Sequence, residues 1–277
     1  MRAFLKVFWR NRGAAAGLVI LLLVALMSAL APVLFPGSPW DMQGAPFAPP
    51  GEEGFLLGSD SLGRDVAAGI AHGAFVSLLV GAVSTLVALG VGVGLGAVAG
   101  YAGGWVDDGV MRFTEFFQTV PSFVLAVVIV AVFTPSLLSI VAAIAIVSWP
   151  PVTRVVRAEF MSLRSREFVQ AAEVLGRSRV SIVLRDILPN ALSPVLVLAS
   201  LMVASAILLE SALSFLGLGD PNRMSWGYMI GAGRSVIRLA WWMSVFPGLA
   251  IFLTVLALNL VGDGLADALN PRVSRRR

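Results

Sequence analysis

Few side chains in this chain could do chemistry by themselves. It has no cysteine and one histidine, His72, which excludes thiolate metal sites, disulfides and multi-histidine sites. We interpret His72 as a polar residue at a membrane boundary. Lys6 is the only lysine and has no glycine-rich loop beside it, so the chain lacks the lysine with which a P-loop reaches the phosphates of ATP. No paired carboxylates, nucleophile-base set or metal-ligand spacing stands out elsewhere, so we expect no catalytic centre and no metal site.

The most informative polar segment runs from about residue 155 to 193. An apolar stripe at helical spacing is followed by Gly176, a typical C-terminal cap; the stripe is Phe168, Ala171, Ala172 and Leu175. A second stripe at i, i+3, i+4, i+7 and i+8 indicates an amphipathic helix, namely Val180, Val183, Leu184, Ile187 and Leu188. We expect Pro189 to stop that helix. The segment is therefore predicted to form two short helices at an angle.

Two interpretations of this segment are open from the residues alone. Its arginines could hold an amphipathic element on anionic lipid. Alternatively, its small alanines could let a protein partner approach the backbone closely. In the second interpretation, this segment is the place where a partner protein supplies the energy for which the chain itself has no visible source.

The elements that must position this segment are membrane helices. The chain is 58% apolar and 13% charged over 277 residues, against about 45 to 50% and 25% in soluble domains. About 20 apolar residues cross the hydrocarbon as a helix. Six runs are candidates: 14–34, 76–100, 116–134, 137–154, 194–212 and 243–262. We expect an all-α membrane protein with six transmembrane helices, in which the glycine-rich second span is a packed interior helix.

Lysine and arginine predict the orientation, because they are retained on the cytoplasmic side. With the N-terminus inside, 16 of the 20 basic residues fall in inner segments and only Arg64, Arg223, Arg234 and Arg238 fall outside. Both termini and the segment 155–193 are therefore predicted to be cytoplasmic. The net charge of +4 reflects this topology, so we expect no nucleic-acid partner.

Some polar residues are candidates for function because burial in lipid is costly. Glu210 and Asn259 lie near opposite ends of their spans, and each could line the pore or gate, or form a helix-helix hydrogen bond. Asp60, Arg64 and Asp65 lie in the outer segment, where they could pair locally or contact an extracytoplasmic protein. We favour the local structural role for these three.

The order Gln170-Ala171-Ala172, Gly176 and Pro189 resembles the cytoplasmic "EAA" coupling loop of ABC importer permeases, with glutamine at 170 where the family usually has glutamate. Residues 57–66, LGSDSLGRDV, are similar to the LGTDxLGRDV signature of the dipeptide, oligopeptide and nickel permeases, specifically their "C" component. The likeness continues at SFLGLG (214–219), SWG (225–227) and NLVGDGL (259–265). It covers essentially the whole chain.

This resemblance implies a type I ABC importer transmembrane domain that forms half of a pore for peptides, or for a related solute such as nickel or glutathione. It implies a second permease, two ATP-binding subunits that hold ATP and magnesium, and an extracytoplasmic solute-binding protein, all at the inner membrane. It assigns the docking on the ATPase to Glu167, Phe168, Gln170, Ala171, Ala172, Gly176, Ser178, Arg179 and Pro189. No cofactor is expected on this chain.

The chain is thus predicted to be organised in four parts. Residues 1–35 form a tail and the first helix, 36–75 an extracytoplasmic segment, 76–263 the transmembrane core, and 264–277 a cytoplasmic tail. The alternative is a secondary transporter or channel without ATPases. That class predicts inverted repeats and acidic residues in mid-span, and neither is evident. An intramembrane enzyme would need a catalytic arrangement that the sequence does not contain.

Overall fold

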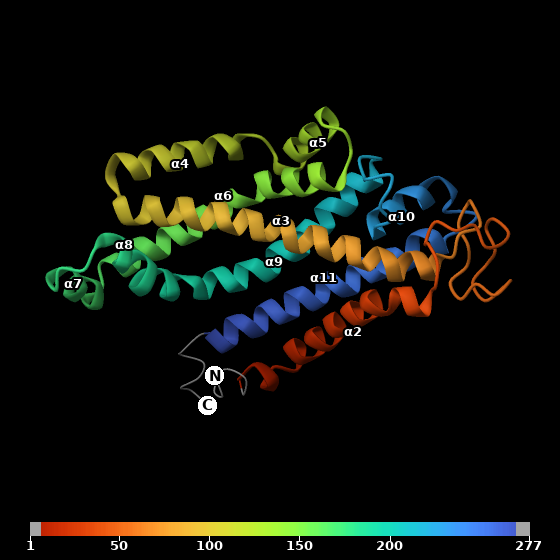
Figure 1. Ribbon diagram of the computed structural model, residues 1–277, viewed down its shortest axis with the longest axis horizontal. Helices are drawn as coiled ribbons and strands as arrows, with labels where there is room; N and C mark the ends of the chain where they lie inside the picture. Colours follow the sequence, from red (N-terminus) through yellow and green to blue (C-terminus); the bar gives the residue numbers. More distant parts are fainter. Residues whose placement is uncertain (1–6, 270–277) are drawn as a thin grey trace.

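The computed structural model describes residues 7–269, so Lys6 and the arginines at 272–277 lie outside the described residues. This part of the chain forms an elongated helical bundle without a β-sheet (Figure 1). Five of its helices are long and apolar enough to cross a membrane, and a bent pair of shorter helices is the sixth candidate. The five are α2 (Arg12–Leu34), α3 (Val66–Ala102), α6 (Leu137–Arg164), the run Arg179–Phe215 and α11 (Trp242–Leu269).

The third predicted span, 116–134, is not one straight helix. Residues 116–119 end α4 (Gly104–Thr119), and α5 (Ser122–Val132) follows after a bend of 79°. The break falls at Pro121, which has no backbone N–H and disfavours helical geometry in the residue before it. Val120 is accordingly extended, with φ −93° and ψ 131°. The prediction of a continuous helix here was wrong because Pro121 cannot donate a helical hydrogen bond and keeps Val120 out of helical geometry.

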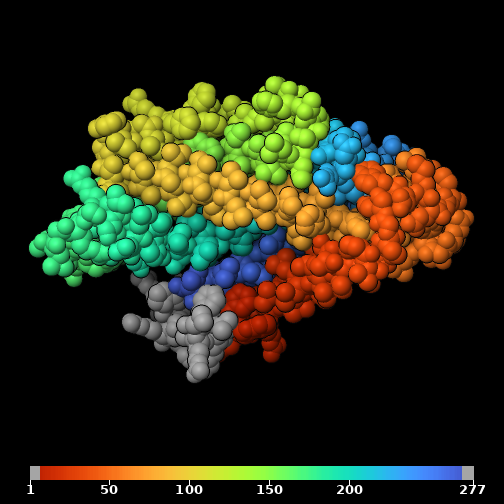
Figure 2. Space-filling view, in the orientation of Figure 1, coloured from red at the N-terminus to blue at the C-terminus, as the bar shows by residue number. Residues whose placement is uncertain are grey.

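Helix α3 begins ten residues before the predicted start of the second span. The carboxylate of Asp65 caps it by accepting the N–H of Ala67 at 2.8 Å. The first turns of α3 are buried against the short helix α10 (Trp226–Gly233), whose Trp226 donates to the carbonyl of Ile70. The outer connection is therefore 36–65, and it covers one end of the bundle (Figure 2).

Helices α3 and α6 pack closely along a glycine face of α3. A Cβ on Gly92 would lie 2.5 Å from Cβ of Val152, and one on Gly96 would lie 2.7 Å from the carbonyl oxygen of Thr153. Gly90 and Gly94 point to open space instead. The prediction that the second span is a packed interior helix is confirmed on this glycine face, where backbones approach as small residues allow.

Helix α2 lies along α11 (Figure 1). At its start Asn11 donates to Asp267 at 3.1 Å, and at its end the carbonyl of Phe35 lies 3.1 Å from Nε2 of His72. Helix α11 continues to Leu269, so the first six residues of the predicted tail 264–277, Asp267 among them, are helical. The boundary of the cytoplasmic tail stays a prediction.

Candidate functional site

The polar segment forms the end of the bundle opposite the 36–65 connection (Figure 1). Helix α6 runs on to Arg164, and α7 (Glu167–Val174) follows after two residues. Gly176 has φ +74°, and its N–H donates to Glu173 while that of Arg177 donates to Ala172. These two bonds make a Schellman motif, which ends the helix in a defined geometry. The predicted glycine cap is confirmed.

The side chains of α7 divide between two faces. Val169 and Ala172 are buried in one core cluster with Phe160, Ile182 and Ile187. Leu175 is 80% exposed and Val174 88% exposed. With Phe168 and Ala171 these two residues form an apolar surface on the solvent side of α7, which we call the α7 face. The sequence stripe included Ala172 but missed Val169, although Val169 precedes it by one helical turn.

The second predicted helix has a different form. Ser178 caps α8 (Arg179–Ser181) by accepting the N–H of Ser181 at 3.3 Å, and a π-helical turn, η1 (Ile182–Ile187), leads directly into α9 (Leu188–Phe215). The N–H of Leu188 reaches the carbonyl of Val183, five residues back. Pro189 therefore does not stop this helix. It lies in the first turn of α9, where the wider π turn accommodates the missing N–H.

The π turn also shifts which side chains face inward. Ile182 and Ile187, five residues apart, are buried, whereas Val180 and Leu184 of the predicted stripe are exposed. An apolar pattern based on the 3.6 residues per turn of an α-helix cannot predict which side chains face inward in a π turn. Arg177 Nη1 lies 2.7 Å from Oδ2 of Asp186, which ties the turn after α7 to η1. The turn after α7 is thus joined to η1, which continues directly into the membrane helix α9.

Glu210 lies near the far end of α9 and is only 2% exposed. Its Oε1 accepts hydrogen bonds of 2.7 Å from Ser214 and from Ser225, which caps α10. Asn259 donates to the carbonyl of Val255 in its own helix at 2.7 Å. Both groups therefore have hydrogen-bond partners within the chain. Their assignment to a pore or gate stays a prediction.

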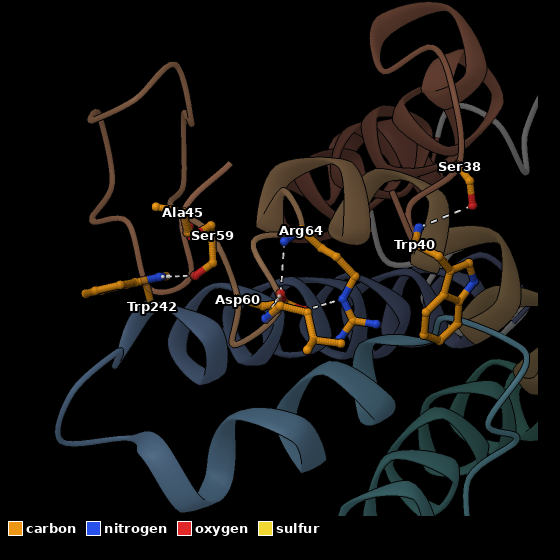
Figure 3. A network of polar contacts seen from close by, with 8 residues as sticks. Ser38, Trp40, Ala45, Ser59, Asp60, Arg64 and Trp242 are labelled. Atoms are coloured by element: carbon orange, nitrogen blue, oxygen red, sulfur yellow. Dashed lines mark hydrogen bonds and ion pairs between the residues drawn. The ribbon is translucent and has the colours of Figure 1, made fainter. Parts of the chain in front are cut away.

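The outer segment holds a compact polar cluster (Figure 3). Arg64 Nε lies 2.5 Å from Oδ2 of Asp60, and its guanidinium lies 5.1 Å from the ring centre of Trp40. Oδ1 of Asp60 also accepts the N–H groups of Leu62 and Arg64. Arg64 is buried. The geometry accounts for Asp60 and Arg64 as residues that hold the fold of this loop.

Unlike Asp60 and Arg64, Asp65 caps the N-terminus of α3. Burial raises the pKa of this carboxyl, and hydrogen bonds from the N–H groups of Ala67 and Ala68 oppose that rise. Beside it, Trp242 at the start of α11 donates to the carbonyl of Ser59 at 3.0 Å. The cluster thus joins the outer connection to two membrane helices.

Comparison with known proteins covers nearly the whole chain. The family model described as "Binding-protein-dependent transport system inner membrane component" matches residues 92–275, and the model "N-terminal TM domain of oligopeptide transport permease C" matches residues 1–50. The di/tripeptide transport system permease protein of Pseudomonas aeruginosa is 41% identical, over 97% of this chain and 92% of the relative. The oligopeptide transport system permease protein of Escherichia coli is 41% identical, over 96% and 89%.

A solved structure shares the fold. It is an inward-facing conformation of the MetNI methionine ABC transporter, with a TM-score of 0.61 and 16% sequence identity, covering 73% of this chain and 96% of that chain. At this identity the likeness concerns the fold alone.

Proposed function

Because this chain belongs to the family of binding-protein-dependent transport system inner membrane components, we propose that it forms half of the pore of an ATP-driven peptide importer and is driven through the α7 face. It is a multi-pass inner membrane protein with the transmembrane fold of type I ABC importers. The partners in this proposal are a second permease, two ATP-binding subunits that carry ATP and magnesium, and an extracytoplasmic solute-binding protein.

The observation that carries the coupling role is the construction of the α7 face. It presents exposed apolar side chains on a helix whose other side is buried and whose end is fixed by Gly176. Exposed apolar surface of this kind is typical of protein contacts. The turn after α7 is tied to η1 by the ion pair of Arg177 and Asp186, and the run Arg179–Phe215 continues from there into α9. A displacement of α7 by the ATPases would therefore move a membrane-spanning helix as a rigid body and switch the access of the pore.

The orientation follows the arginine count, which favours the α7 end inside and the 36–65 connection outside. In this orientation the connection is the surface nearest to a solute-binding protein. Peptides are the proposed solute because the relatives from Pseudomonas aeruginosa and Escherichia coli are named as peptide permeases. Nickel and glutathione are alternative solutes for the same type of pore.

The test replaces an exposed apolar residue of the α7 face by a charged one. Ala171→Arg and Leu175→Asp leave the buried face of α7 intact and place an unpaired charge in the proposed contact. We expect peptide-stimulated ATP hydrolysis by the reconstituted complex to fall at least about tenfold, as for a central interface residue. Ser162→Arg, an exposed site on α6 at the same end of the molecule, is the control.

Two results would contradict the proposal. If both α7 variants assembled and retained wild-type stimulation and peptide uptake, the coupling surface would lie elsewhere. If the purified chain admitted peptide without ATPase subunits or ATP, it would be a channel or secondary transporter instead.

A further inference from the structure

The end of the molecule opposite α7 carries exposed charges of both signs, and each sign is confined to one segment. The connection 36–65 exposes three charged side chains, all acidic, which we call the acidic patch: Asp41, Glu52 and Glu53. The segment 216–241, which contains α10, also exposes three, all basic, which we call the basic patch: Arg223, Arg234 and Arg238. The two segments are neighbours, because Trp40 packs edge-on against Tyr228 with ring centres 5.2 Å apart (Figure 1).

The arginines of the basic patch have no acidic partner in the part of the chain that the structure describes, where none of them has a carboxylate within 4.0 Å. The carboxylate of Asp220 in the same segment is already used by the fold, since it accepts the N–H groups of Leu137 and Asn222. Arg234 is held in position, because it donates to the carbonyl of Phe215 at 2.6 Å and lies 5.7 Å from the centre of that ring. The guanidinium groups of the patch are therefore available to a partner.

The acidic patch is unpaired as well. Asp41 accepts the N–H of Ser38 at 2.8 Å and Glu53 accepts that of Ala45 at 3.3 Å, but within residues 7–269 no cationic side chain lies within 4.0 Å of either, or of Glu52. The two patches therefore do not neutralise each other.

Membrane topology makes the basic patch unexpected on the outer side, because arginine and lysine are retained in the cytoplasm. In the proposed orientation four arginines lie outside, and one of them, Arg64, is taken up by its ion pair with Asp60. The other three form the basic patch. Separate patches of opposite sign are typical of surfaces that attract and orient a charged partner. The distribution thus points to a protein contact on the outer side.

We propose that the two patches together form the docking surface for the solute-binding protein, which presents carboxylates to the basic patch and cationic side chains to the acidic patch. This inference rests on the proposed importer and on its orientation. The pair of patches also selects one orientation of the solute-binding protein, since a half turn about the membrane normal would bring like charges together.

The test measures the dissociation constant of the peptide-binding protein encoded with this chain for the assembled transporter in nanodiscs of phosphatidylcholine. An exposed ion pair changes affinity about threefold. Arg223→Gln/Arg238→Gln, which leaves the contacts of Arg234 in place, should therefore raise the dissociation constant about tenfold at low salt. Glu52→Gln/Glu53→Gln should raise it by a similar factor. Both effects should disappear at about 0.5 M salt, where the screening length falls to about 4 Å.

The matched control is Asn222→Ala/Ser235→Ala, which changes two exposed residues beside Arg223 and Arg234 without changing the charge. This control should dock like the wild type. Size-exclusion chromatography of each variant with the second permease and the ATPase subunits shows whether the transporter is assembled.

The proposal is overturned if either charge variant docks as tightly as the control. It is also overturned if the glutamine variant of the acidic patch docks more tightly than the wild type, because the partner would then be acidic over both patches. An arginine variant that fails to assemble with the second permease would assign the basic patch to a contact between permeases, and that result overturns the proposal too. If the wild-type transporter bound no solute-binding protein at all, the proposed function itself would be contradicted.

Discussion

Ser225 Oγ donates a hydrogen bond of 2.7 Å to Oε1 of Glu210, and the same hydroxyl accepts the N–H of Tyr228 at 3.1 Å. One side chain therefore caps α10 and links it to a carboxylate of α9. Ser214 donates to the same carboxylate oxygen at 2.7 Å. Trp226, the next residue after Ser225, connects α10 to α3 through the hydroxyl of Ser77. Glu210 thus organises the contact of three helices in a buried region.

Removal of this carboxylate should destabilise the bundle. Glu210→Ala leaves two buried hydroxyls without their acceptor and opens a cavity, and we expect a loss of about 2 to 4 kcal/mol in the free energy of unfolding. Glu210→Gln keeps an acceptor oxygen in the same place, so it should lose less than about 1 kcal/mol. Denaturant unfolding in detergent measures both. Equal stability of the two variants would show that the hydrogen bonds to the serines do not matter.

The glycine face of α3 predicts a contrast between two near neighbours. Gly92→Ala would place a methyl group 2.5 Å from Cβ of Val152, and overpacking of this kind costs about 1 to 3 kcal/mol. Gly94→Ala meets no atom within 4 Å and should be neutral or stabilise the helix by up to about 1 kcal/mol. Thermal unfolding midpoints of the two variants give the comparison. A Gly92→Ala protein as stable as Gly94→Ala would contradict the close packing of α3 on α6.

The stability of the outer cluster should depend on the guanidinium group of Arg64. Arg64→Gln leaves the half-buried carboxylate of Asp60 without its charged partner, and we expect a loss of about 1 to 3 kcal/mol in the free energy of unfolding. Arg64→Lys retains the charge but loses the planar contact with Trp40, so an intermediate loss is expected. Limited proteolysis within residues 36–65 reports this loop directly. Arg223→Gln, at an exposed site, is the control and should leave the cleavage rate unchanged.

A second ion pair holds α4 against α6. Arg157 donates from Nε to Oδ1 of Asp107 and from Nη2 to Oδ2, the latter at 2.6 Å. Because hydrogen bonds to charged groups contribute about 1.5 to 3 kcal/mol, Asp107→Asn should lower stability by that amount. Asp108→Asn, its exposed neighbour, should have little effect. A double-mutant cycle with Arg157→Gln isolates the pair, and a coupling energy near zero would show that α4 is held by packing alone.

Several features could be predicted because each belongs to one segment. Hydropathy identified the membrane helices, a local glycine ended α7, and the glycine-rich second span indicated a packed interior helix. Residues 116–134 do not form the single helix that was predicted, although Pro121 was visible, because neighbouring helices decide whether a proline bends a span or breaks it. The prediction that Pro189 stops a helix was wrong for a related reason, since a π turn restores the continuity of the backbone.

The sequence by itself determined that this is a multi-span membrane protein with one structured polar segment, because composition and local helix signals act over a few turns. Only the tertiary structure decided that Val169 and Ile182 are buried, that Glu210 receives the hydroxyl of Ser225, and that Arg64 lies over Trp40. These contacts join residues from different segments. Their partners depend on how helices pack in three dimensions, which no local pattern specifies.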